Sequence, residues 1–145
     1  MRLVVLNGPN LNLLGQREPE VYGRTTLAEI EAAVRKRASA LGVTLEWVQS
    51  NHEGALVDAV QGLKGRADGA IVNAAALTHT SLALRDAFLA VRVPFVEVHL
   101  SNLFAREPAR QHTLLADVAV GFVCGFGALG YTLALEGLVE RLRHA

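Results

Sequence analysis

The chain has 145 residues, and its fourteen basic and fourteen acidic side chains leave it without net charge. Hydrophobic residues make up 51% of it and charged residues 19%, which is typical of a globular protein rather than a disordered one. A neutral chain offers no overall attraction for DNA, RNA or an anionic membrane, so none of these partners is expected. The length fits one domain over residues 1–145.

The sequence also indicates where in the cell the protein is located. The first apolar run, residues 3–6, is too short for the core of a signal peptide or for a membrane span. Cys124 is the only cysteine, so no internal disulfide can form. We therefore expect a cytoplasmic protein. Its high apolar content also favours some surface being hidden in an oligomer.

Short apolar runs alternate with longer amphipathic ones along the chain. Residues 3–6 form a continuous apolar run, typical of a strand buried on both faces. Residues 43–49 alternate between apolar and polar side chains, which indicates an edge strand with one solvent-exposed face. Three further buried strands are predicted at 70–72, 95–98 and 118–123. Cys124 follows the last of these and is predicted to be inert core.

Helical spacing appears between the strands. Thr26 and Glu29 form a capping box, and apolar residues then follow at helical intervals until Gly42. Further helices are predicted before Gly65, before Pro94 and at the C-terminus. This alternation predicts an α/β, flavodoxin-like fold with a five-stranded parallel sheet and helices on both faces.

Parallel sheets of this kind bind ligands at the carboxyl ends of their strands. Polar residues follow each of the first four predicted strands here, with asparagines that are not needed to fill a core. Four of the five histidines lie in or near these connections: His52, His79, His99 and His112. Amides and imidazoles with few carboxylates favour a small polyhydroxy acid as ligand rather than a metal.

Residues 7–23 form the most informative segment. Its glycines and prolines indicate a mobile loop, and the loop carries both Arg17 and Tyr22. A phenol is a weak base, but a neighbouring guanidinium favours the phenolate. The alternative is a surface loop in which Tyr22 packs on a helix and Arg17 is solvated.

The segment, Asn-Gly-Pro-Asn-Leu-Asn-Leu-Leu-Gly followed by Arg-Glu-Pro and Tyr-Gly, resembles the opening motif of the type II 3-dehydroquinate dehydratases. Three later blocks keep the order and spacing of that family: 49–54, 78–86 and 97–108. The resemblance covers nearly the whole chain. It implies the cofactor-free conversion of 3-dehydroquinate to 3-dehydroshikimate and water through an enolate, a step of the shikimate pathway and of aromatic amino acid biosynthesis. It also implies a homododecamer built from trimers.

The resemblance assigns roles residue by residue. Tyr22 is implied as the base and His99 as the acid, while Arg17 stabilises the developing charge. Glu97 would orient His99, and Asn10 would hold the water that meets the enolate. The implied substrate-binding residues are Asn73, His79, Asp86, Leu100, Ser101 and Arg110. Asp86 would reach the site of a neighbouring subunit.

Two stretches depart from the family pattern. Ala74, Ala75 and Ala76 follow Asn73, where the family usually has Pro-Gly-Ala. Leu103 and Phe104 stand where Pro-His is common. The chemistry supports the assigned pair independently, because Glu97 and His99 are alternate residues of one strand and therefore face the same side.

Three other interpretations use the same residues. Residues 125–130 spell a dinucleotide-binding fingerprint, but the acidic residue expected about 20 positions later would fall beyond Ala145. The alternative is that these glycines allow close packing of the last helix. A metal site at Glu97 and His99 lacks compact ligand spacing. A non-catalytic homologue of the same fold also fits the two departures.

Overall fold

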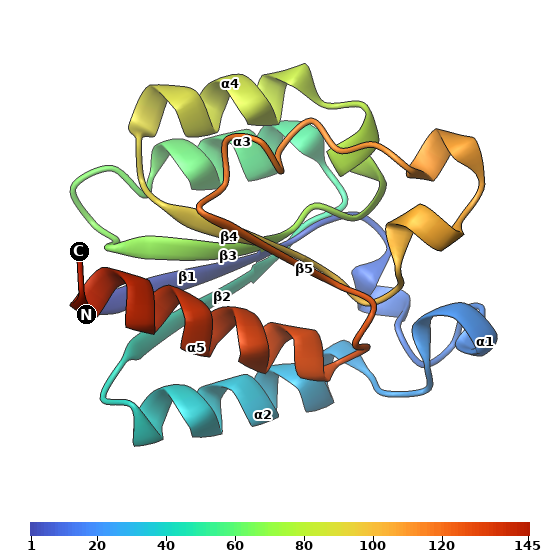
Figure 1. Ribbon diagram of the computed structural model, residues 1–145, viewed down its shortest axis with the longest axis horizontal. Coiled ribbons are helices and arrows are strands. Elements are labelled where there is room, and N and C mark those ends of the chain that lie inside the picture. The colour runs from blue at the N-terminus through green and yellow to red at the C-terminus, as the bar shows by residue number, and fades with distance from the viewer.

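The computed structural model describes residues 1–145 and consists of one parallel sheet between two layers of helices (Figure 1). Its strands are β1 (Arg2–Asn7), β2 (Thr44–Gln49), β3 (Gly69–Asn73), β4 (Phe95–His99) and β5 (Gly121–Cys124). The strand order is β2-β1-β3-β4-β5, and every neighbouring pair is parallel. This is the flavodoxin-like order, so the predicted fold class is confirmed.

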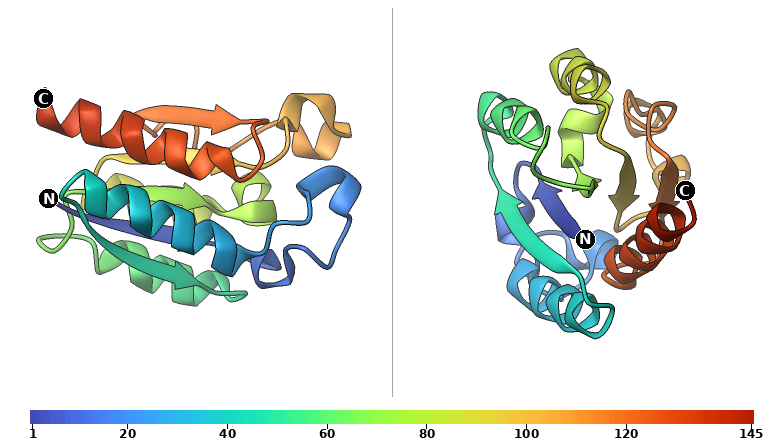
Figure 2. Two further views of the ribbon diagram at one scale, coloured as in Figure 1. Left: turned by 90° about the horizontal axis from the view of Figure 1, so that it is seen from below. Right: turned by 90° about the vertical axis from the view of Figure 1, so that its left-hand side faces the viewer.

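Two helices cover each face of the sheet (Figure 2). Helices α2 (Leu27–Ala40) and α5 (Leu129–Arg143) lie on one face, and α3 (Glu53–Gln61) and α4 (Leu82–Val91) lie on the other. None of the helices has the length and apolarity needed to cross a bilayer. The short elements lie in the connections that follow β1, β3 and β4: α1 (Pro19–Tyr22), η1 (Leu11–Leu13), η2 (Ala75–His79), η3 (Leu103–Ala105) and η4 (Pro108–Arg110).

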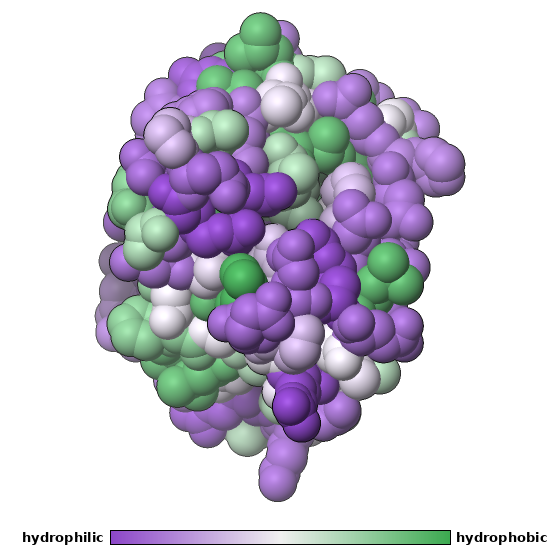
Figure 3. Space-filling view, turned by 90° about the vertical axis from the view of Figure 1, so that its right-hand side faces the viewer, coloured by the Kyte–Doolittle hydropathy of each residue, from purple (hydrophilic) through white to green (hydrophobic).

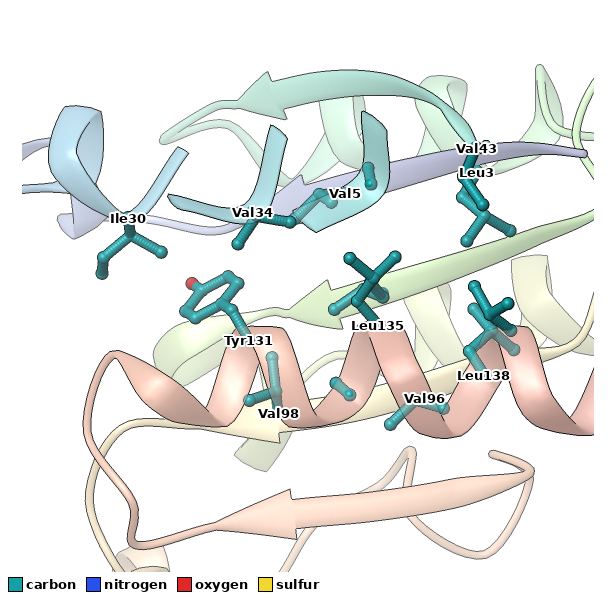
Figure 4. Packing of buried hydrophobic residues seen from close by; sticks show 14 of the residues in the cluster. Leu3, Val5, Ile30, Val34, Val43, Val96, Val98, Tyr131, Leu135 and Leu138 are labelled. Atoms are coloured by element: carbon teal, nitrogen blue, oxygen red, sulfur yellow. The ribbon is translucent and has the colours of Figure 1, made fainter. Parts of the chain in front are cut away.

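The central strand β1 is buried on both faces, as its apolar run predicts. Leu3 and Val5 pack in the core under α2 and α5, where they lie in one cluster with Leu135 (Figure 4). Val4 and Leu6 point the other way and pack with residues of α3 and α4. A fully buried side chain of this kind stabilises the fold by roughly 1.5–3 kcal/mol. The sheet is therefore a rigid platform for the loops at its carboxyl edge.

Local signals define the helix ends. The predicted capping box is present, since the Glu29 N–H donates to Thr26 Oγ1 at 3.2 Å and the Thr26 N–H donates to Glu29 Oε1 at 3.4 Å. The same helix ends just before Gly42, whose φ of 73° suits a residue without a side chain. The prediction for α3 was too long. That helix ends at Gln61, and Leu63 is buried in the turn that follows it.

The prediction for the last strand was wrong in extent and burial. Strand β5 begins at Gly121 rather than at residue 118, and it is a half-buried edge strand. Val118 and Val120 pack against the two cores from the segment that leads into the strand, which explains the longer apolar run. Cys124 is accordingly half-buried at the end of an edge strand and not part of the core.

Candidate active site

A pocket opens at the carboxyl ends of β1, β3 and β4, beside the point where the strand order reverses. Figure 3 looks onto this end of the molecule, which is largely hydrophilic. Flavodoxin-like proteins bind their ligands at this position. The pocket is lined by Pro9, Asn10, Leu11, Leu14, Arg17, Tyr22, Asn73, Ala75, Ala76, His79, His99, Leu100, Ser101, Leu103, Arg106 and Arg110.

The floor of the pocket depends on a close approach between the segments that follow β1 and β3. The Gly8 N–H donates to the Asn73 carbonyl at 2.8 Å. A Cβ on Gly8 would lie 2.4 Å from the Ala74 carbonyl oxygen, so no larger residue fits there. Two residues later Asn10 adopts a left-handed conformation with φ 70° and turns the chain into the pocket wall.

His99 and Glu97 meet at the end of β4, as their alternate positions predict. Nε2 of His99 lies 2.5 Å from Oε2 of Glu97, and both side chains are buried. Because the carboxylate accepts from Nε2, Nδ1 is the nitrogen left for a ligand in the pocket. Glu97 lies behind His99 and lines no part of the pocket. The arrangement holds the imidazole in one orientation.

Two threonines complete the surroundings of Glu97. Thr78 Oγ1 donates to Oε2 at 2.8 Å, and Thr113 Oγ1 lies 2.8 Å and 2.9 Å from the two carboxylate oxygens. The Thr113 hydroxyl also accepts the N–H groups of Leu115 and Ala116, so its own hydrogen is free to go to Glu97. Each carboxylate oxygen of Glu97 therefore accepts from at least one hydroxyl group, which fixes the orientation of the carboxylate beside His99.

Two guanidinium groups lie close to Tyr22. The Arg17 guanidinium carbon lies 4.7 Å from the Tyr22 ring centroid, and that of Arg106 lies 5.4 Å from it. Arg106 Nη2 also donates to the Tyr22 hydroxyl oxygen at 3.3 Å, and Nη1 donates to Ser101 Oγ at 3.2 Å. Two positive charges therefore lie close to the phenol, where they can stabilise negative charge that forms during a reaction. The predicted pairing of Arg17 with Tyr22 is present, and Arg106 adds to it.

The pocket is electropositive although the chain is neutral. Arg17, Arg106 and Arg110 line it, and no aspartate or glutamate does. Glu18 and Glu107 approach these guanidinium groups from outside, at 3.9 Å from Arg17 and 2.5 Å from Arg110. Such a site attracts a small anion, and planar guanidinium groups recognise carboxylates in particular.

His79 and His112 join two loops at one side of the pocket. Nδ1 of His79 donates to the His112 carbonyl at 2.6 Å, and Nε2 of His112 donates to the His79 carbonyl at 3.0 Å. Burial lowers the pKa of His79, so its ring stays neutral at pH 7. With Nδ1 carrying the hydrogen, Nε2 is an acceptor that can take the hydrogen of a ligand hydroxyl group.

The structure brings together most of the residues that the sequence indicated. Nine of the eleven line the pocket, namely Asn10, Arg17, Tyr22, Asn73, His79, His99, Leu100, Ser101 and Arg110. Glu97 contacts the pocket only through His99. Asp86 is exposed on α4 and lines no part of it. His52 and His112 were expected at the same cleft, but neither lines it.

The two asparagines at the strand ends correct another expectation. Asn7 and Asn73 are 0% and 3% exposed, so both are buried, and of the two only Asn73 also lines the pocket. Each is bonded to the hydroxyl of Tyr131, a residue for which no motif or spacing indicated a role. Arg106, Thr78 and Thr113 were also missed. Arg106 and Thr78 lie in motif blocks, but nothing in their spacing shows that they contact Tyr22 and Glu97.

The glycines at 125–130 have structural partners. The N–H groups of Gly125 and Gly127 donate to the carbonyls of His99 and Leu100, at 3.3 Å and 2.9 Å. A Cβ on Gly130 would lie 3.2 Å from a methyl of Val98, which supports the packing interpretation. The Gly130 N–H donates to the Gly127 carbonyl at 3.1 Å, so all three glycine N–H groups are already used and this turn is not free to hold a diphosphate. No group of three or more His, Cys, Asp or Glu side chains is placed to share a metal ion.

Comparisons with known proteins agree with this geometry. Residues 1–139 match the model of the family described as dehydroquinase class II. The chain belongs to that family. A 3-dehydroquinate dehydratase of Synechococcus sp. (strain WH7803) is 61% identical over 99% of this chain and 97% of the relative. Catabolic 3-dehydroquinase 1 of Aspergillus terreus is 55% identical over 92% of this chain and 88% of its own length.

Solved structures of family members share the fold closely. The type II dehydroquinase of Butyrivibrio crossotus superimposes with a TM-score of 0.93 at 37% identity, covering 96% of this chain and 97% of that one. The type II dehydroquinase of Propionibacterium acnes gives a TM-score of 0.92 at 35% identity, with 96% of each chain covered. The type II family predicted from the sequence motifs is therefore confirmed.

Proposed function

We propose that the chain dehydrates 3-dehydroquinate to 3-dehydroshikimate, a step of the shikimate pathway, as a hydro-lyase that needs no cofactor. The observation that carries the proposal is that one pocket contains two ionisable side chains with different electrostatic surroundings. Two guanidinium groups lie close to Tyr22, whereas His99 is backed by a buried carboxylate. The first environment favours a base and the second an acid, which are the two groups that an elimination requires. The names of the relatives support the same reaction.

In the proposed mechanism Tyr22, as phenolate, removes a proton from C2 of the substrate. The C2–H electron pair moves toward the ketone and produces an enolate, whose charge Arg17 stabilises. Collapse of the enolate then breaks the bond between C1 and its hydroxyl group. His99 gives its Nδ1 proton to that oxygen, and water leaves. The tyrosine proton must afterwards return to the imidazole, which restores both groups.

The remaining pocket residues are assigned to binding. Asn10 is proposed to hold a water molecule beside the enolate oxygen. His79 offers its neutral Nε2 to a substrate hydroxyl, since its Nδ1 hydrogen is used by His112. Arg110 is proposed to bind the substrate carboxylate together with the Leu100–Ser101 segment. This assignment is supported by the absence of any acidic side chain in the lining.

An imine mechanism has no suitable amine here. The two lysines of the chain, Lys36 and Lys64, are exposed and do not line the pocket. A Schiff base requires an amine beside the substrate carbonyl. Borohydride added with substrate should therefore leave activity intact, whereas substrate-dependent inactivation with a mass adduct on either lysine would contradict the mechanism.

We also propose that the enzyme is a homododecamer, a tetramer of trimers, and that Asp86 completes a neighbouring subunit's pocket. Asp86 is exposed on α4 and absent from its own pocket, which supports a role across an interface. Light scattering should give a large symmetric particle. A fully active monomer would contradict this part of the proposal.

The deciding experiment for the activity follows 3-dehydroshikimate by its ultraviolet absorbance. Purified protein should form it from 3-dehydroquinate at a steady rate, without added metal or nucleotide. Protein carrying Tyr22→Phe should serve as the matched control because it lacks only the hydroxyl group. A wild-type preparation that is folded, assembled and inactive would identify a non-catalytic member of the family.

A further inference from the structure

A line of buried and half-buried hydrogen bonds crosses the sheet beneath the pocket, from the Val48 carbonyl through Asn73 to the Ala75 N–H. Asn7 Nδ2 donates to the Val48 carbonyl at 3.0 Å, and the Tyr131 hydroxyl donates to Asn7 Oδ1 at 2.7 Å. Asn73 Nδ2 donates to the Tyr131 oxygen at 3.0 Å, and the Ala75 N–H donates to Asn73 Oδ1 at 3.1 Å. Figure 4 shows Tyr131 projecting from α5 with its hydroxyl toward the end of the sheet where the strands finish.

The direction of every bond in this line is fixed by its two ends. The Val48 carbonyl can only accept, so Asn7 must present its NH2 group there and its oxygen to Tyr131. Tyr131 must then give its single hydrogen to Asn7, which leaves its oxygen as an acceptor for Asn73. At the other end the Ala75 N–H can only donate, so it requires the Asn73 oxygen. Both ends impose the same orientation on the Asn73 amide.

The tyrosine is suited to hold this orientation. Tyr131 is fully buried, and its ring stacks on Trp47 with a centroid distance of 5.8 Å. Burial raises the pKa of Tyr131, while the hydrogen bond from Asn73 lowers it by less, so the hydroxyl keeps its hydrogen at neutral pH. The donor to Asn7 is therefore present under the conditions of the assay.

We propose that Tyr131 is a positioning residue, which fixes the Asn73 amide so that Asn73 presents an N–H, and not its oxygen, to the substrate. The inference rests on the proposed function, since Asn73 lines the pocket of that reaction. One Nδ2 hydrogen is used by Tyr131, and the second remains for a ligand. Its partner must be an oxygen acceptor of the substrate, such as a hydroxyl, carboxylate or enolate oxygen. A flipped amide would present a repelling oxygen instead.

The test is a double-mutant cycle on kcat/KM between Tyr131→Phe and Asn73→Leu. Tyr131→Phe keeps the stacked ring but removes the hydroxyl group, so the amide loses one of its two fixed partners. We expect kcat/KM to fall by about tenfold, as for the loss of one oriented hydrogen bond. In the Asn73→Leu background the same change should alter kcat/KM by less than about twofold, because Tyr131 acts only through Asn73. Equal losses in both backgrounds would show a general structural role and overturn the inference.

Asn7→Leu provides a second route if Tyr131→Phe does not fold. Asn7 lines no part of the pocket, and its replacement removes the acceptor that fixes the Tyr131 hydrogen. The freed hydroxyl can then donate toward Asn73 and favour the flipped amide. We expect kcat/KM to fall several-fold in this variant, and a wild-type value would overturn the inference. Wild-type activity in the same assay separates the two questions, since an inactive wild type refutes the proposed function itself.

Discussion

Thr113 donates to the carboxylate of Glu97, which in turn holds the imidazole of His99. Through these two contacts a loop residue helps to orient a buried pair. Thr113 belongs to the segment between η4 and β5, whereas Glu97 and His99 belong to β4. The orientation of the proposed acid therefore depends on a hydroxyl group from a different part of the chain.

Thr113→Val should impair both stability and turnover. The isosteric side chain removes one donor to a buried carboxylate, which costs about 1–3 kcal/mol of stability. It should also lower kcat, because Glu97 gains freedom to turn away from His99. Thermal unfolding and steady-state kinetics measure the two effects. Thr80→Val is the matched control, since Thr80 is exposed and does not contact Glu97; a Thr113→Val enzyme with wild-type kcat would contradict this role.

Tyr22→Phe should nearly abolish turnover and leave the fold intact. Loss of a general base costs roughly 100- to 10,000-fold in rate. Between Arg17 and Thr25 every backbone hydrogen bond joins residues of that segment or its immediate neighbours, so the loop adds little to the core. The melting temperature should accordingly change by less than about 2 °C. Near wild-type turnover in this variant would remove Tyr22 from the mechanism.

Arg17 and Arg106 should differ in what their removal affects. Both flank the Tyr22 ring, but only Arg106 is bonded to its hydroxyl and to Ser101. Arg17→Ala should reduce kcat by roughly 100-fold, as for the loss of a charge-stabilising group, with little effect on stability. Arg106→Ala should reduce kcat and also lower the melting temperature, because its side chain is only 16% exposed. Arg24→Ala, in the same loop as Arg17, is the control, and equal behaviour of all three variants would refute the distinction.

The sequence predicted the fold because its signals are local. The capping box of α2, the apolar run of β1 and the alternation of Glu97 and His99 each act over a few residues. The missed contacts join residues far apart in the chain. Tyr131 and Asn7 are separated by 124 positions, and Arg106 and Tyr22 by 84. Periodicity does not reveal which loops meet at the end of a sheet.

The motif blocks nevertheless contain two of the residues that were missed at the site. Arg106 and Thr78 both lie in segments that resemble the family, although their partners became evident only from the structure. The edge strand β5 shows the opposite error. There, apolar residues leading into the strand gave the pattern of a longer, buried one. A run of apolar residues indicates that the segment is buried, but a buried segment need not be a strand or a helix.

Ala75→Gly should stabilise the protein. Ala75 has φ 53°, a left-handed conformation that costs a residue with a Cβ roughly 1–2 kcal/mol. Glycine removes that strain but adds roughly 0.4–1 kcal/mol of freedom to the unfolded chain. The net gain should be about 0.5–1 kcal/mol, which corresponds to a rise of about 2 °C in melting temperature. Ala76→Gly is the control, because Ala76 has no positive φ and should lose stability; a fall in both variants would show that position 75 is not strained.

Acid should weaken an ion pair between α4 and the segment that leads into β5. Arg85 binds Asp117 through two hydrogen bonds, of 2.5 Å and 2.9 Å, and also donates to the Leu114 carbonyl at 2.9 Å. These bonds tie α4 to the segment that carries Thr113. The Arg85 guanidinium holds the pKa of Asp117 below its ordinary value of 3.8. A group whose pKa is lowered by folding contributes stability above its ordinary pKa and loses it as the pH falls through the folded value.

Asp117→Asn should therefore be less stable than the wild type at pH 7, and the difference should shrink as the pH falls below the ordinary pKa of 3.8. Urea unfolding at a series of pH values measures this. Asp58→Asn is the matched control, because Asp58 is exposed on α3 and takes part in none of the ion pairs. If the ion pair also positions Thr113, Asp117→Asn should lower kcat at pH 7 while Asp58→Asn leaves it unchanged. A stability difference between Asp117→Asn and wild type that persists unchanged to pH 2 would show that the carboxylate charge is not its source.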